Sequence, residues 1–102
     1  MSEFLARAPA AVTELLHEAA EEMVRLFNIS YAEAVARVNA QWEGQDFLEA
    51  SDIVLHEDEY YWALFIYFGG NVPDWRRDAD RSTWEPKSAP PRDSEFWTLT
   101  EE

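Results

Sequence analysis

The chain has 102 residues, of which 47% are hydrophobic and 15% aromatic, and its 21 acidic and 8 basic residues give a formal net charge of −13. Such a composition can bury a core, so we expect a single folded domain over 1–102 rather than a disordered chain. The negative charge repels phosphates and anionic membranes, so we expect no nucleic acid and no membrane among its partners, and a basic protein is favoured. No cysteine is present, which excludes disulfides and thiolate chemistry.

Two further features concern origin and location. Seven of the eight basic residues are arginine and alanine is abundant, a bias typical of a GC-rich, bacterial genome. The N-terminus shows no basic leader followed by an apolar segment, so the expected location is the cytoplasm.

The first predicted element is an amphipathic helix over 9–27. Apolar residues recur every three or four positions from Val12 to Phe27, which indicates a face that packs on a core. Pro9 suits the first helical turn, where its missing N–H is not needed.

A second helix is predicted to begin at Ser30. Ser30 and Glu33 have the spacing of a capping box, in which the serine oxygen accepts from the third helical N–H. Gly44 is placed to end this helix. Because the connection between the two helices is short, they are expected to pack against each other.

The third element is the uncharged run Tyr60–Phe68, which neighbouring elements must cover on most sides. At nine residues it is far shorter than the roughly 20 needed to cross a bilayer. The acids at 57–59 suit the N-terminus of a helix and the pair Gly69-Gly70 suits its C-terminal end, so this run is favoured as a helix. The alternative is an α+β fold with a hairpin at 52–68, because aromatic residues favour strands.

Four prolines and no regular period mark the chain from Asn71 onward. We expect an irregular segment over 71–102 whose tryptophans dock on the helices, with a short strand over Phe96–Thr100. The predicted fold is therefore mainly α: a small three- to four-helix bundle, with its helical core at about 3–70 and a long irregular Trp/Pro-containing C-terminal segment packed on it.

The favoured functional hypothesis is a non-catalytic, acidic protein-interaction domain. An inhibitor or immunity-type protein that binds a basic partner would be one specific form of it. The candidate docking surface combines acids with tryptophans of the C-terminal segment: Glu57, Asp58, Glu59, Trp75, Asp78, Asp80 and Trp84.

The rival hypothesis is a small-molecule or metal-binding protein. Glu14 and His17 have the Glu-x-x-His spacing of helical di-metal sites, but His56 has no acid three residues before it to supply the second copy. No activated nucleophile and no glycine-rich phosphate loop are present, so no cofactor and no catalytic residue are assigned. A homo-oligomer that buries the apolar run remains a third option. The ligand-binding candidates are Glu14, His17, His56, Tyr60, Tyr61 and Tyr67.

Overall fold

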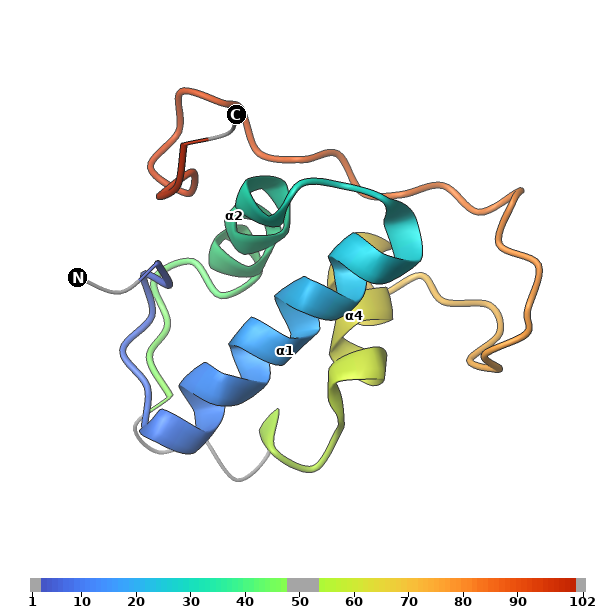
Figure 1. The fold of residues 1–102 in the computed structure, drawn as a ribbon, viewed down its shortest axis with the longest axis horizontal. Coiled ribbons are helices and arrows are strands. Elements are labelled where there is room, and N and C mark those ends of the chain that lie inside the picture. The colour runs from blue at the N-terminus through green and yellow to red at the C-terminus, as the bar shows by residue number, and fades with distance from the viewer. Residues whose placement is uncertain (1–2, 48–53, 101–102) are drawn as a thin grey trace.

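The computed structural model describes residues 3–47 and 54–100, and in these ranges it contains the helices α1 (Ala10–Phe27), α2 (Tyr31–Gln41) and α4 (Glu59–Tyr67) (Figure 1). α1 packs against both α4 and α2, which contact each other less. No strand occurs in the described ranges. The mainly helical prediction is therefore confirmed.

The ends of α1 and α2 follow from local sequence. Pro9 is the N-cap of α1, so the helix begins one residue later than predicted. Asn28 caps the C-terminal end of α1: it adopts the left-handed conformation with φ of 56° and donates its N–H to the Val24 carbonyl. The Ser30 hydroxyl oxygen then accepts the Glu33 N–H at 3.0 Å, which confirms the predicted start of α2.

α4 forms where the sequence offered either a helix or a strand. The Asp58 carboxylate accepts the Tyr61 N–H at 2.9 Å and caps the helix. At the other end Gly69 and Gly70 have φ of 62° and 85°, and the Gly70 N–H bonds back to the Phe65 carbonyl at 2.9 Å, as in a Schellman motif. The alternative hairpin at 52–68 is therefore wrong for its described part, because both ends of this run are helix boundaries. Residues 52–53 lie outside the described residues.

The core lies between the three helices. α1 contributes a row of buried residues at helical spacing, and α4 presents its buried side to the same interior. A second cluster forms around Phe68, where Phe27 of α1 and Trp84 of the C-terminal segment pack against it. The largest fully buried side chains are Leu16, Met23, Leu64, Ile66, Val12, Val35 and Val38.

α2 buries two polar side chains, Arg37 and Asn39. The Arg37 guanidinium pairs with Glu33 at 2.9 Å, lies 4.6 Å from the Tyr67 ring centroid and donates to the Lys87 carbonyl at 2.6 Å. The Lys87 N–H donates in turn to the Tyr67 carbonyl at 2.9 Å. The C-terminal segment is thus fixed where it crosses α2 and α4.

Asn39 joins both ends of the chain to α2. Its side-chain amide donates to the carbonyls of Glu3 at 3.2 Å and Phe96 at 2.9 Å, and its oxygen accepts the Leu5 N–H at 2.9 Å. The Thr98 hydroxyl also donates to the Glu3 carbonyl, at 2.6 Å. These contacts make the C-terminal segment a packed part of the fold, as predicted (Figure 1).

The short strand predicted at Phe96–Thr100 is wrong. These residues form turns and irregular chain. The Phe96 carbonyl bonds to the Asn39 amide and to the Thr98 N–H, so it is satisfied without a neighbouring strand.

Candidate functional site

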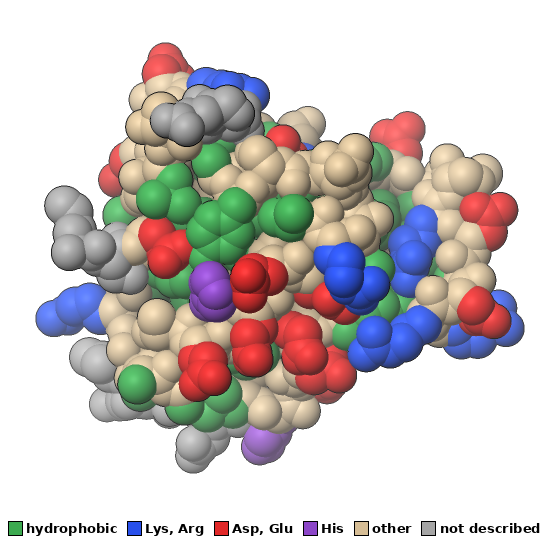
Figure 2. Space-filling model, in the orientation of Figure 1, with side chains coloured by type: hydrophobic (Ala, Val, Ile, Leu, Met, Phe, Trp, Pro, Cys, Tyr) green, Lys and Arg blue, Asp and Glu red, His purple; other side chains and the backbone are tan. Residues whose placement is uncertain are grey.

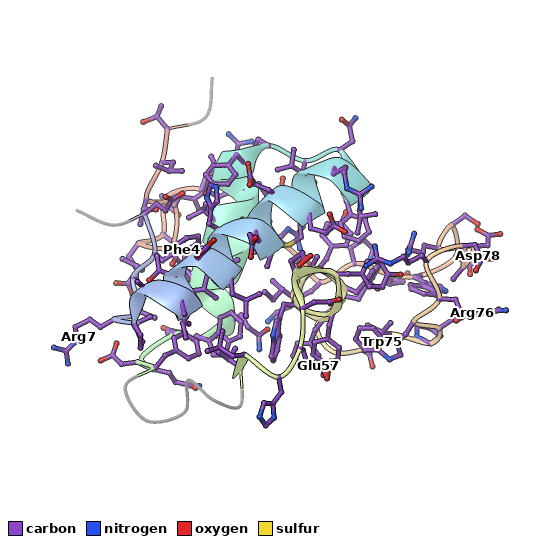
Figure 3. All side chains as sticks on the ribbon, turned by 60° about the horizontal axis from the view of Figure 1, so that its bottom comes forward. Phe4, Arg7, Glu57, Trp75, Arg76 and Asp78 are labelled. Atoms are coloured by element: carbon purple, nitrogen blue, oxygen red, sulfur yellow. The ribbon has the colours of Figure 1, made fainter. Side chains whose placement is uncertain are left out.

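The candidate site lies at the start of α4, where the C-terminal segment passes it. The Trp75 indole stacks flat on the Tyr61 ring, with 4.6 Å between centroids and 7° between planes. Tyr61 also stacks on Phe65, with 5.9 Å between ring centroids. We call Tyr61, Phe65 and Trp75 the aromatic patch. Trp75 is 40% exposed, so this rigid stack reaches the molecular surface (Figure 3).

Acidic residues precede the aromatic patch in the chain. Glu57 and Asp58 are exposed and Glu59 is half-buried in the first turn of α4. One Asp58 oxygen accepts the Tyr61 N–H, so this carboxylate also holds the patch in position. Figure 3 shows Glu57 on the same side of the molecule as Trp75. The structure therefore brings the predicted residues Glu57, Asp58, Glu59 and Trp75 to the same end of α4.

The charge of Asp74, directly before Trp75, is balanced by Arg76 in the same segment. The Arg76 side chain and backbone N–H both donate to its carboxylate, with the shortest contact at 2.7 Å. These hydrogen bonds, the side-chain ones first, lower the pKa of Asp74 to about 2. Asp74 and Arg76 thus fix the backbone that carries Trp75.

Asp78 and Asp80 lie on a loop that also carries Arg76, Arg77 and Arg81. Asp80 accepts the Ser82 N–H, which lowers the pKa of its carboxyl. Figure 3 places Asp78 at the far end of this loop from Glu57. The loop is balanced in charge, so these two acids add little to a negative docking surface.

Trp84 packs inward rather than outward. The ring centroids of Trp84 and Phe68 lie 5.2 Å apart, with 75° between the ring planes, and the Trp84 side chain is half-buried. Trp84 therefore anchors the C-terminal segment to α4, whereas Trp75 remains available at the surface.

His17 takes part in a chain of polar contacts that joins α1, α2 and the residues before α1. Its Nδ1 lies 2.6 Å from the Tyr31 hydroxyl and its Nε2 3.1 Å from Glu21. The Tyr31 hydroxyl donates to the Glu3 carboxylate, and His17 Nε2 faces the Glu21 carboxylate. Burial, together with the bond to Glu3, raises the pKa of Tyr31. Both ring nitrogens of His17 therefore already have partners within the protein.

The other ligand-binding candidates are dispersed. Within the described ranges no three His, Cys, Asp or Glu residues are grouped as metal ligands. His56 is exposed, and the two histidines lie apart on the face shown in Figure 2. The Tyr60 hydroxyl accepts from Arg81 at 2.7 Å and donates to the Arg76 carbonyl at 3.1 Å, so it holds the C-terminal segment. The Tyr67 ring stacks on the Phe27 ring, with 3.9 Å between the ring centroids. The metal or small-molecule hypothesis gains no support from this arrangement.

Two further surface features bear on binding, and only the second of them escaped sequence reasoning. The exposed acids Glu14, Glu18 and Glu21 follow helical spacing on the outer side of α1, where Figure 2 shows acidic side chains gathered. A groove of about 430 Å³, which we call the end groove, opens beyond the end of α2. No sequence signal could reveal the groove, because three distant segments form it: its lining residues are Leu5, Ala6, Asn39, Trp42, Glu43, Gly44, Gln45, Asp46, Glu95 and Phe96.

Comparisons with known protein families, with curated proteins and with solved structures found no match for this chain. Among the described residues, no helix has the length and apolar character that crossing a membrane requires.

Proposed function

We propose that the chain is a non-catalytic domain that binds a basic protein through the aromatic patch and the acids at the start of α4. The observation that carries the proposal is the exposed, flat stacking of Trp75 on Tyr61. An indole held rigid before binding loses little conformational entropy, and tryptophan is among the residues that most often dominate interface energies.

Charge supports a basic partner. The chain carries a net charge of −13, and Glu57 forms no ion pair with another described residue. A negative field accelerates encounter with a positive surface, and this effect weakens as salt screens it. A cytoplasmic bacterial protein that neutralises a basic toxin or enzyme, as an inhibitor or immunity protein does, is the specific form that we favour.

The test is capture of partners by the tagged chain at low salt, followed by calorimetry with the purified partner. Trp75→Ala is expected to weaken binding by about tenfold or more, and Trp75→Phe to restore part of it. Glu57→Gln should slow association, whereas Glu18→Gln, the same charge change on α1, should have a smaller effect.

A binding constant that does not change between low and high salt would contradict the electrostatic part of the proposal. Unchanged affinity of Trp75→Ala, with its fold verified by circular dichroism, would exclude the aromatic patch as the contact.

A further inference from the structure

The end groove is a second concave surface, separate from the aromatic patch. The N-terminal segment, the turn after α2 and the C-terminal segment form its sides, and Asn39 and Trp42 of the α2 end also line it. Asn39 bonds to two of these segments, through Leu5 and Phe96, so the groove walls are fixed relative to each other. Its volume of about 430 Å³ falls in the range of small-molecule sites, about 300 to 1,000 Å³.

The charge of the end groove is negative. Asp46 is already paired with Arg7, whose Nε lies 3.2 Å from the carboxylate and whose backbone N–H donates to it at 2.8 Å. Glu43 and Glu95 make no ion pair or side-chain hydrogen bond with another described residue. The C-terminal end of α2 adds the negative end of the helix dipole, and its last turn has no basic residue. Two uncompensated carboxylates and a helix end therefore favour a cation in the groove.

Aromatic rings line the same groove. The Trp42 ring is fixed by edge contacts to Phe47 at 5.2 Å and Trp62 at 5.4 Å. The backbone of Phe96 is fixed by its carbonyl bond to Asn39. Aromatic rings attract organic cations and cover the carbon stem of the ligand at the same time.

A guanidinium fits this combination better than an ammonium does. It is planar, stacks on aromatic rings and donates two parallel hydrogen bonds to a carboxylate. The chain uses the same chemistry on its own surface, where the Arg92 guanidinium lies 4.9 Å from the Trp97 ring centroid.

We propose that the end groove binds a guanidinium on an aliphatic stem, either a free small molecule or an arginine side chain of a partner. Glu43 and Glu95 pair with the guanidinium, and Trp42 and Phe96 contact the stem. The proposal uses none of the residues of the aromatic patch, so either proposal can fail without the other.

The experiment is a titration of the full chain with n-butylguanidinium, followed by nuclear magnetic resonance at the Trp42 indole N–H and the Gly44 amide. The matched probe n-butylurea has the same shape without charge. Saturable shifts at these two groups with n-butylguanidinium, and none with n-butylurea, are the expected result. The double variant Glu43→Gln/Glu95→Gln should weaken binding by about tenfold or more.

The control is Glu14→Gln/Glu18→Gln, which removes the same charge from the outer side of α1 and should leave the affinity nearly unchanged. A capped Gly-Arg-Gly peptide separates the sources: a site for a partner's arginine binds the peptide at least as well as the free probe, and a small-molecule site binds the free probe better. The proposal is overturned if no saturation occurs, if n-butylurea shifts the same signals, or if both double variants weaken binding equally.

Discussion

At the scale of single residues, the two buried polar side chains of α2 decide where the rest of the chain lies. Arginine and asparagine side chains are seldom buried, and both Arg37 and Asn39 direct donors to carbonyls of segments far away in the sequence. Buried donors need partners, so each side chain imposes a definite path on the chain that passes it. The walls of the end groove depend directly on Asn39.

Asn39→Ala is expected to lower the free energy of unfolding by about 2 to 3 kcal/mol, because it removes three hydrogen bonds and leaves the Leu5 N–H without its partner. Urea denaturation measures the change. Asn71→Ala, on an exposed residue, should stay within about 0.5 kcal/mol of the wild type. Equal stability of the two variants would show that Asn39 is not a structural junction.

The ion pair of Asp74 with Arg76 predicts a pH dependence. The pKa of an aspartate in the unfolded chain is about 3.9, whereas in the folded state hydrogen bonds from Arg76 hold the pKa of Asp74 at about 2. On acidification the unfolded chain binds this proton first, so the pair stabilises the fold above pH of about 4 and the contribution is lost as the pH falls toward 2.

Carbon nuclear magnetic resonance of the Asp74 carboxyl measures this titration directly. Arg76→Ala should raise its midpoint toward the ordinary value without reaching it, because the backbone N–H of residue 76 still donates. Arg92→Ala, which removes an arginine elsewhere in the C-terminal segment, should leave the midpoint unchanged. A midpoint near 4 in the wild type would contradict the geometry.

At the scale of elements, α4 shows how local signals resolve an ambiguous run. Tyr, Trp, Phe and Ile favour strands, yet the Asp58 cap and the Gly69-Gly70 stop set both boundaries of a helix. These signals are local in sequence, which is why the start of α2, the helical state of this run and its end could all be predicted. The position of the C-terminal segment could not, because its contacts join residues 50 and 57 positions apart.

Glycine substitutions test the link between α4 and the C-terminal segment. Gly69→Ala and Gly44→Ala both place a side chain at positive φ, which costs roughly 1 to 2 kcal/mol. A Cβ at Gly44 meets nothing within 4 Å, whereas one at Gly69 lies 3.2 Å from Lys87 Cδ and 3.3 Å from Lys87 Cβ. The Lys87 backbone is bonded to Tyr67 and resists displacement, so Gly69→Ala should destabilise the fold more in urea denaturation. An equal loss of unfolding free energy in Gly69→Ala and Gly44→Ala would contradict the close approach of Lys87.

At the scale of the whole molecule, the sequence predicted the type of fold better than the surface. The helices and their buried faces follow from periodicity, and the docking of the tryptophans follows from their apolar area. The sequence could not predict which tryptophan remains exposed, because nothing in the residues around Trp75 and Trp84 distinguishes the two. In the structure, Trp84 contacts Phe68 in the second core cluster, whereas Trp75 contacts Tyr61 at the surface. The distinction depends on the packed path of the C-terminal segment.

The compactness of the molecule agrees with a C-terminal segment that packs on the helices. The radius of gyration of the Cα atoms is 13.1 Å, close to the roughly 13 Å of a folded domain of 100 residues. Both proposals therefore require the same thing, a C-terminal segment that presents Trp75 on one surface and closes the end groove on another.

Native-state hydrogen exchange at the Lys87 amide and the Trp97 indole tests this requirement most directly. Both N–H groups are bonded within the fold, to the carbonyls of Tyr67 and Pro90. We predict that both are protected, with an opening free energy for Lys87 close to that of Met23 in the centre of α1. Exchange of the Lys87 amide and the Trp97 indole at the rates of an unfolded chain, while Met23 stays protected, would contradict the account.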